Sequence, residues 1–367
     1  MQVYWVETEN FRLLAGQKVE FSPGINVITG ENAQGKTTLL EAVYLLTGAR
    51  SFRTSFDREL IAFEADSAFV GGAVRAADRD QKIELRLLRG RTRQMKRNGV
   101  RSTPAQMRDA LKAILFSPDD LGMVRGPAAA RRRLMDAAIS QLRPGYGALL
   151  ADYNRVYENK LRILKDWREK PSLLEPLDDF SRSLAAYSAR LIRYRASFAR
   201  LLCEAAAPIH REFSAGQEEL SIGYATVSTV ADPAAPEREI FDAVWERQNQ
   251  LRQAELDAGS CLVGAHKDDL TIAINGVDAR SFASQGQART AALSVKLAER
   301  DIFLDDTGEM PVLLLDDVLS ELDAARQEFV LNHIGGGQTL VTCCEAESVS
   351  RLLSGRVLHM EKGRVTG

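Results

Sequence analysis

The residues best suited to chemistry form a short glycine-rich loop. Residues 30–37 read GENAQGKT, which fits the phosphate-binding pattern G-x-x-x-x-G-K-[ST]. Its glycines let backbone N–H groups wrap phosphate oxygens, Lys36 would reach the β- and γ-phosphates, and the Thr37 hydroxyl would hold Mg²⁺. The candidate nucleotide-binding residues here are Gly30, Glu31, Asn32, Ala33, Gln34, Gly35, Lys36, Thr37 and Thr38. The loop predicts a site for ATP and Mg²⁺.

A pair of acids supplies the second half of this site. Asp316 and Asp317 follow four apolar residues, 312–315, a pattern typical of a parallel-sheet strand buried on both faces. Carboxylates at the carboxyl end of such a strand manage Mg²⁺ and the attacking water. We expect Asp316 to join Thr37 as a metal ligand, and Asp317 to act with Lys36 in catalysis by orienting or deprotonating water. The alternative is two solvated acids at a strand end.

A second phosphate site is predicted far downstream. Residues 282–299 read FASQGQARTAALSVKLAE, in which small and polar residues lead into a helix. Backbone N–H groups at a helix start favour an anion. The candidate residues are Ser284, Gln285, Gly286 and Gln287. Because the first loop already covers one side of a nucleotide, we expect these residues to reach the γ-phosphate bound to another copy of the chain, giving an ATP-dependent homodimer. The alternative is an internal helix cap.

The elements around these residues predict an α/β fold. The strand 25–29 precedes the phosphate loop, a helix with apolar positions from Leu39 to Leu46 follows it, and buried strands are expected at 311–317 and 338–344. We expect a P-loop ATPase lobe assembled from residues 1–117 and 259–367, with a helical lobe, 118–258, inserted between its two parts. The 367 residues are enough for such a two-lobed core.

The helical insertion carries a coiled-coil-like seam. Apolar residues recur in steps of three and four from Leu177 to Leu201, and more loosely from Leu150 to Trp167. Two prolines between these stretches would stop a helix. We expect an antiparallel helical hairpin with arms of roughly 25 residues, or about 35 Å. Two ordinary core helices packed on the main body are the alternative.

A run of basic residues is the candidate DNA surface. Eleven lysines and arginines lie between residues 75 and 108, opposed by three acids, and the stretch 88–101 predicts two strands around a basic turn. The candidates for DNA contact are Arg89, Arg91, Arg93, Lys96 and Arg97. No aromatic residue lies among them, which favours phosphate contact with duplex DNA over base stacking. A solvated basic hairpin is the alternative.

Other charged residues carry weaker signals. Arg131, Arg132 and Arg133 lie at the start of a predicted helix, where cations are unfavourable, so they require acids or a phosphate as partners. His266 is either a γ-phosphate sensor or a loop histidine. The formal net charge of −2 excludes nucleic-acid binding through a global positive field, so it must come from a local patch.

The bulk composition indicates a cytoplasmic protein. The N-terminal residues include acids and no long apolar core, and the longest apolar run is far too short to cross a bilayer, so no membrane association is expected. The four cysteines, Cys203, Cys261, Cys343 and Cys344, have no metal-ligand spacing. We expect all four to be small buried residues of a reducing compartment.

Motifs spread along the chain resemble those of a known family. The phosphate loop, SQGQ and LLLDDVLSELD resemble the ATP-binding-cassette type of ATPase head, whose signature serine and glycine contact nucleotide across a dimer. Together with ENFRLL, RSFRTSFDREL, FSPDDLGMVRGPAAARRRLMD and GAHKDDL, they resemble the bacterial RecF family over residues 9–323. The resemblance implies an ATPase that binds double-stranded DNA at gaps and single-strand/double-strand junctions, with RecR and, indirectly, RecO as partners in loading RecA.

The sequence departs from the family pattern in a few places. Thr38 replaces an asparagine, Ala265 and Lys267 replace a proline and an arginine, and Cys343 and Cys344 stand where threonines are usual, which puts their contact with a γ-phosphate in doubt. The second acid, Asp317, is one methylene shorter than the glutamate of many cassette ATPases, so we expect slow hydrolysis. The rivals are a chromosome-maintenance (SMC-like) head, which needs far longer coiled coils, a transporter ATPase, and a clamp that uses ATP without hydrolysing it.

Overall fold

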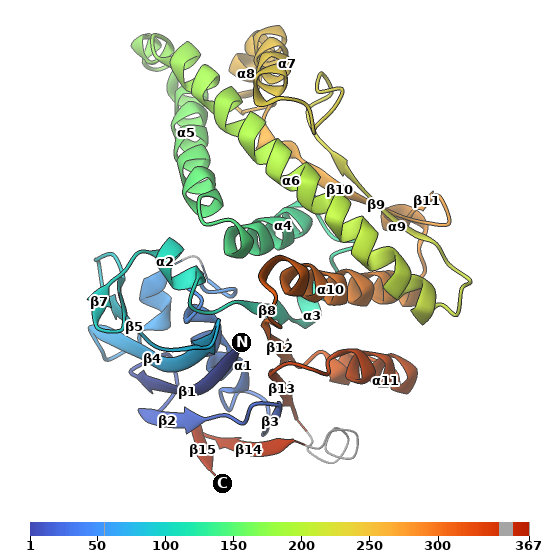
Figure 1. The fold of residues 1–367 in the computed structure, drawn as a ribbon. Coiled ribbons are helices and arrows are strands. Elements are labelled where there is room, and N and C mark those ends of the chain that lie inside the picture. Colours follow the sequence, from blue (N-terminus) through green and yellow to red (C-terminus); the bar gives the residue numbers. More distant parts are fainter. Residues whose placement is uncertain (55, 345–354, 367) are drawn as a thin grey trace. The chain divides into compact units, whose positions relative to one another are not determined.

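A computed structural model describes residues 1–54, 56–344 and 355–366 (Figure 1). The chain divides into two compact units, of which unit 1 comprises Met1–Gly122 with Ala292–Gly367 and unit 2 comprises Met123–Ala291. Both ends of the chain therefore build unit 1. The division after residue 291 places residues 259–291, with the signature candidates, in unit 2, whereas the sequence had grouped them with the ATPase lobe.

The first sheet of unit 1 brings the ends of its buried strands together. Its strand order is β15-β14-β3-β13-β12-β8, and all neighbours except β15 run parallel. The strands are β3 (Ile25–Thr29), β8 (Ala113–Phe116), β12 (Val312–Asp316), β13 (Thr339–Cys343), β14 (Arg356–Glu361) and β15 (Arg364–Thr366). Asp316 is paired with Thr342, and Cys343 with Thr29. Because β3 and β12 both flank β13, the loop after β3 and the acids after β12 lie at the same sheet edge.

The second sheet of unit 1 is antiparallel, in the order β2-β1-β4-β5-β6-β7. Its strands are β1 (Gln2–Glu9), β2 (Gln17–Glu20), β4 (Ser67–Ala76), β5 (Arg79–Leu88), β6 (Gln94–Arg97) and β7 (Val100–Arg101). Buried and solvent-facing residues alternate in β5, as expected for a strand with one covered face. The expected pair of strands around a basic turn is present as β5 and β6.

Helix α1 (Lys36–Leu45) lies in the core of unit 1. Nine of its ten residues are buried, among them Leu39, Leu40 and Val43, which pack with side chains of both sheets. Shorter elements complete this part of the chain. They are η1 (Asp57–Leu60), α2 (Pro104–Arg108), α3 (Pro118–Leu121), η4 (Leu319–Glu321) and α11 (Ala324–His333). The helix that follows the phosphate loop is thus fixed on all sides by packing.

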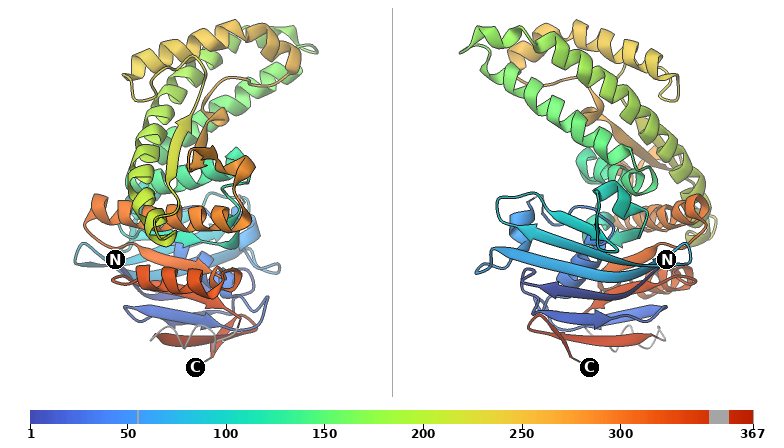
Figure 2. Two further views of the ribbon diagram at one scale, coloured as in Figure 1. Left: turned by 90° about the vertical axis from the view of Figure 1, so that its right-hand side faces the viewer. Right: turned by 60° about the vertical axis from the view of Figure 1, so that its left-hand side comes forward.

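Unit 2 contains the predicted helical hairpin. Helices α5 (Tyr146–Asp166) and α6 (Leu177–Phe213) lie side by side and are joined through η2 (Pro171–Leu174) at one end (Figures 1 and 2). At 37 residues, or about 55 Å, α6 is longer than expected. Ile192 of α6 also packs with Ile240 and Val244 of α7 (Glu237–Gln250). The hairpin is therefore packed against another helix of its own unit.

The remaining elements of unit 2 include a small sheet, β11-β10-β9. They are α4 (Ala128–Leu142), β9 (Leu220–Ala225), α8 (Arg252–Ala258), η3 (Ala265–Lys267), β10 (Asp269–Ile274), β11 (Val277–Asp278) and α9 (Ala279–Phe282). Helix α10 (Gln285–Thr307) then continues from unit 2 into unit 1. In its unit 1 half, Lys296 Nζ lies 2.5 Å from Glu299 Oε2 in a buried ion pair. One helix thus carries the signature candidates at its start and a buried charge pair further along.

The cysteines only partly meet the expectation of burial. Cys261 and Cys343 are buried, and burial raises the pKa of the two thiols to about 12 and about 11. Cys203 is half-buried, and Cys344 is exposed, so the expectation is wrong for Cys344. Its strand β13 ends at Cys343, which places Cys344 outside the sheet core. Among the described residues, no helix is long and apolar enough to span a membrane.

Candidate nucleotide-binding site

The backbone of the phosphate loop requires its glycines. Gly30 has φ +148°, and a Cβ added there would lie 2.3 Å from the carbonyl oxygen of Met360. Gly35 has φ +108°, and a Cβ there would lie 2.9 Å from a methyl carbon of Leu13. Only glycine combines a positive φ with the absence of a Cβ, so only glycine fits these two positions without strain. The loop therefore has a fixed shape between β3 and α1, as a backbone cradle for phosphate requires.

Lys36 is held at this loop by main-chain oxygens. Its Nζ donates to the carbonyl oxygens of Gly30 and Glu31, at 2.6 and 3.0 Å. The residue is 7% exposed, so its ammonium group is largely shielded from water. A positive charge is thereby fixed beside the glycine-rich backbone, where an incoming phosphate would meet it.

Thr37 and Asp316 form the junction between the loop and the acidic strand end. Thr37 Oγ1 donates to Asp316 Oδ1 at 2.8 Å, and Thr342 Oγ1 donates to the same oxygen at 3.0 Å. Burial raises the pKa of Asp316, while these two hydrogen bonds act in the opposite direction. A hydroxyl and a carboxylate oxygen side by side match the oxygen ligands of Mg²⁺, which takes few protein ligands beside phosphate and water. The two residues therefore fit the predicted metal site.

Asp317 has a strained backbone next to this pair. Its φ of +54° lies in the left-handed region, which is uncommon for a residue other than glycine. Its N–H donates to Thr342 Oγ1 at 2.9 Å, and Ser320 Oγ lies 3.0 Å from its Oδ1. These contacts hold Asp317 directly after the end of β12, beside Asp316.

Three neighbours of the site were missed or doubted at the level of sequence. Cys344 Sγ lies 3.6 Å from Lys36 Nζ and 3.1 Å from Asn32 Oδ1, so this cysteine does border the phosphate loop. Thr342, which contacts both acids, gave no signal beyond its place at the end of a strand. Glu41, fully buried in α1, forms a two-bond ion pair with Arg12 at 2.6 and 3.0 Å. In the sequence, the position of Glu41 among the apolar residues of the predicted helix was the one sign of this buried acid.

The signature candidates form a capped helix start in unit 2. Gln287 N donates to Ser284 Oγ at 3.2 Å, and Ser284 N donates to Gln287 Oε1 at 2.9 Å. This reciprocal pair is a capping box. Ser284 and Gln285 are exposed, while Gly286 and Gln287 are half-buried. Ser284 and Gln287 therefore do cap the helix, which was the alternative interpretation of these residues. In this cap the Ser284 hydroxyl accepts a hydrogen bond and lies at the surface, where it can still donate its own proton.

The basic candidates differ in how many hydrogen bonds and ion pairs their side chains form with other residues of the chain. Arg93 is paired with Asp57 and donates to the carbonyl of Ala49, and its side chain is 9% exposed. Arg89 donates to three carbonyl oxygens of residues 62–65, and Arg97 to that of Gln106. Arg91 and Lys96 are exposed. The structure therefore gives Arg93 a structural contact, which sequence patterning could not reveal.

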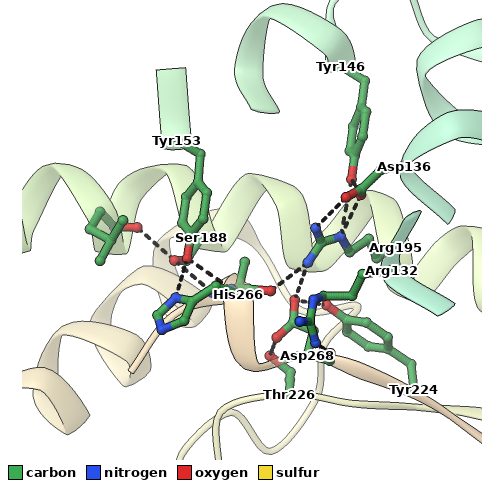
Figure 3. Close-up of polar contacts among 12 residues, drawn as sticks. Arg132, Asp136, Tyr146, Tyr153, Ser188, Arg195, Tyr224, Thr226, His266 and Asp268 are labelled. Carbon is green, nitrogen blue, oxygen red and sulfur yellow. Dashed lines mark hydrogen bonds and ion pairs between the residues drawn. The ribbon is translucent and has the colours of Figure 1, made fainter. Parts of the chain in front are cut away.

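His266 and Arg132 of α4 belong to a polar network inside unit 2 (Figure 3). Tyr153 Oη lies 2.7 Å from His266 Nδ1, and burial lowers the pKa of His266 to about 4. This environment supports the loop-histidine alternative. Arg131 Nε donates to Asp269 Oδ1 at 2.7 Å, so Arg131 has an acid of the protein as its partner.

The centre of this network is Arg195 of α6. It donates to Asp136 of α4 and to Asp268, each at 2.9 Å (Figure 3). Tyr224 and Thr226 also hydrogen-bond to Asp268. Burial raises the pKa of Asp268 to about 6, against the opposing effect of Arg195 and these hydroxyls. The residues of the GAHKDDL motif thus tie α4, α6 and the small sheet together.

Comparison with known proteins agrees with these features. Residues 2–364 match the family model described as the RecF/RecN/SMC N terminal domain. The chain is 36% identical to the DNA replication and repair protein RecF of Acetivibrio thermocellus over 92% of each chain. It is 38% identical to the protein of the same name from Listeria innocua, with 100% of this chain and 99% of the relative covered.

Solved structures show the same relationship. A structure of the recombination mediator protein RecF with ATPrS, described as part of the RecFOR pathway, has a TM-score of 0.91 at 34% identity, covering 99% of this chain and 97% of the other. The Smc head domain of Pyrococcus furiosus has a TM-score of 0.54 at 16% identity, with 99% and 95% covered. The latter likeness concerns the fold alone.

Proposed function

Because the chain belongs to the RecF family of DNA replication and repair proteins, we propose that it is an ATPase that binds duplex DNA in its ATP-bound state and acts in recombinational repair. The hydrogen bond between Thr37 Oγ1 and Asp316 Oδ1 carries the ATPase part of this proposal. It joins the phosphate loop to the acidic strand end within one unit, which is the arrangement that nucleotide hydrolysis requires.

Each chain binds one ATP with Mg²⁺ through its own unit 1. The backbone of residues 30–35 cradles the phosphates, and Lys36 exchanges its carbonyl partners for phosphate oxygens. Thr37 and Asp316 would hold Mg²⁺, which would supply positive charge beside the phosphates. Asp317 orients the attacking water and accepts its proton. The ATP-bound RecF structure with 35% identity and a TM-score of 0.89 supports the choice of nucleotide.

A second copy completes the site. The Ser284 hydroxyl donates a hydrogen bond to the γ-phosphate bound to the other copy. The N–H groups at the start of α10 face the same γ-phosphate. Two chains related head to tail then bury two ATP molecules, and hydrolysis releases them. Asp317 is a carboxylate one methylene shorter than glutamate, so we expect turnover below the ~10–1000 per second of fast enzymes, as suits a timed switch.

The dimer binds double-stranded DNA at gaps and single-strand/double-strand junctions, with RecR as a direct partner and RecO as an indirect one in loading RecA. The exposed Arg91 and Lys96 of the β5–β6 region supply phosphate contacts. ATP drives this cycle by assembling the two copies, so DNA binding and nucleotide state are coupled.

The coupling is tested by fluorescence anisotropy with a gapped duplex, with Mg-ATP, with Mg-ADP and without nucleotide. The proposal predicts tight binding with ATP only, and its loss in Lys36→Ala. Lys170→Ala, which removes an exposed lysine between α5 and η2, is the matched control. Equal DNA affinity in all three nucleotide conditions would contradict the proposal.

A further inference from the structure

We infer that Glu218, held by His210, positions the signature residues of α10 for the nucleotide of a second copy. Gln287 Nε2 donates to Glu218 Oε1 at 2.9 Å, and Glu218 Oε2 lies 3.0 Å from His210 Nε2. All three residues belong to unit 2. The inference rests on the proposed function, because it concerns the same site in the dimer.

The side chain of Gln287 is committed to two contacts within the protein. Its Oε1 accepts from Ser284 N, and its Nε2 donates to Glu218. Gln287 N in turn donates to Ser284 Oγ at 3.2 Å. An amide fixed at both ends sets the orientation of Ser284, whose Oγ accepts one bond and keeps its proton for a phosphate oxygen. Gln287 is therefore a positioning residue, and Ser284 is the residue that touches the nucleotide.

Glu218 is itself fixed on a tight turn. Its N–H donates to Ser214 Oγ at 3.1 Å, and Ala215 and Gly216 just before it have positive φ angles of 50° and 78°. The next residue, Glu219, exchanges two hydrogen bonds of 2.8 Å with Asn275 in the β10–β11 turn. The carboxylate thus has a rigid base between α6 and the small sheet.

The charges at this place favour a geometric role. A carboxylate close to an anion site repels phosphate, so electrostatic attraction does not explain Glu218. His210 does not neutralise it, because burial lowers the pKa of this histidine. Since both carboxylate oxygens of Glu218 are acceptors, the neutral imidazole carries its proton on Nε2 and donates it. The pair therefore contributes orientation rather than positive charge.

Three variants separate orientation from charge. Glu218→Ala removes both the charge and the acceptor. Glu218→Gln removes the charge but keeps an acceptor for Gln287, and the His210 tautomer adapts to the amide. Glu204→Ala is the matched control, because Glu204 is an exposed acid of α6 paired only with Arg200 among the contacts described. The side chain of Glu218 is only 20% exposed, so Glu218→Ala also removes packing that Glu218→Gln retains.

The dissociation constant of the Mg-ATP dimer, measured by sedimentation on the full chain, is the readout. Glu218→Ala should weaken dimerisation by about tenfold or more, the loss expected for a hydrogen bond to a charged group. Glu218→Gln and Glu204→Ala should stay within about threefold of the wild type. The affinity of the monomer for a fluorescent ADP analogue should not change in any of them, which a general loss of structure would not allow.

Stronger dimerisation in both Glu218 variants would overturn the inference, because it would make Glu218 only a repelling charge. Unchanged dimerisation in Glu218→Ala, or equal weakening in Glu218→Gln, would also overturn it. Absence of any ATP dimer in the wild type would instead overturn the proposed function and this inference with it. A wild-type dimer that Glu218→Ala leaves intact overturns the inference alone.

Discussion

Thr37 Oγ1 and Asp316 Oδ1 lie 2.8 Å apart, although 279 positions separate the two residues in the chain. The contact follows from the order of the parallel sheet, since β3 and β12 both flank β13. Thr342 at the end of β13 hydrogen-bonds to the same carboxylate oxygen. The ends of two strands and the first turn of α1 thereby supply the residues of one candidate metal site.

Replacing Asp317 by asparagine tests the role of this acid. The amide can hold a water molecule but cannot accept its proton, so ATP turnover should fall by about 10²–10⁴-fold while nucleotide binding and dimerisation persist. Steady-state phosphate release and sedimentation measure the two effects. Unchanged turnover would make Asp317 structural and would favour a clamp in which ATP only joins the copies.

Replacing His266 by glutamine should change how stability depends on pH. Because the pKa of His266 is lowered to about 4, the folded chain binds fewer protons than the unfolded one, and stability from this residue is lost as pH falls from 6.5 towards 4. Asp268 has the opposite effect on the free energy of unfolding. Because its pKa is raised to about 6, its ionisation destabilises the fold as the pH rises towards 6.

His266→Gln should therefore gain stability relative to the wild type on acidification, by about 1 kcal/mol per pH unit between pH 6 and 5. Urea unfolding followed by tryptophan fluorescence measures the difference. A constant offset between variant and wild type at all pH values would contradict the assignment of a neutral, buried histidine.

Removing the central arginine of the network in unit 2 should destabilise that unit strongly. Arg195→Met leaves Asp136 and Asp268 without their main positive partner, at a cost of about 3–5 kcal/mol. Arg200→Met is the control, because Arg200 is exposed on the same helix and its pair with Glu204 contributes little. Thermal unfolding gives the comparison, and equal effects of the two substitutions would refute a structural network.

Arg91 and Arg93 should differ in their effect on DNA binding. Arg91→Ala removes an exposed phosphate contact and should lower the slope of log affinity against log salt by about one. Arg93→Ala breaks the pair with Asp57 and should lower the thermal midpoint without changing that slope. Titrations of duplex binding at several salt concentrations measure the two slopes. A slope that changes only in Arg93→Ala would show that Arg93, and not Arg91, contacts the DNA.

The sequence predicted the parts of the molecule that depend on local patterning. The phosphate loop, the buried strand that ends at Asp316 and the hairpin of α5 and α6 each follow from spacing within one segment. The family, ATPase head fold and RecF likeness were confirmed by comparison.

Contacts between distant segments could not be predicted in this way. The pairing of Glu218 with Gln287 and of Arg93 with Asp57 depends on how turns and strands pack. The sequence alone does not show which arginine of this stretch is buried and which is exposed. Sequence patterning also offers no signal for a division within α10, because a single continuous helix gives no composition change at residue 291.

The most direct test of the central claim is the solution mass by sedimentation velocity, with Mg-ATP, with Mg-ADP and without nucleotide. The account predicts that the mass doubles with ATP only. It also predicts that Ser284→Arg abolishes this doubling while keeping the nucleotide affinity of the monomer. A mass that stays that of one chain in Mg-ATP, or a Ser284→Arg variant that still doubles, would contradict an ATP site shared between two copies.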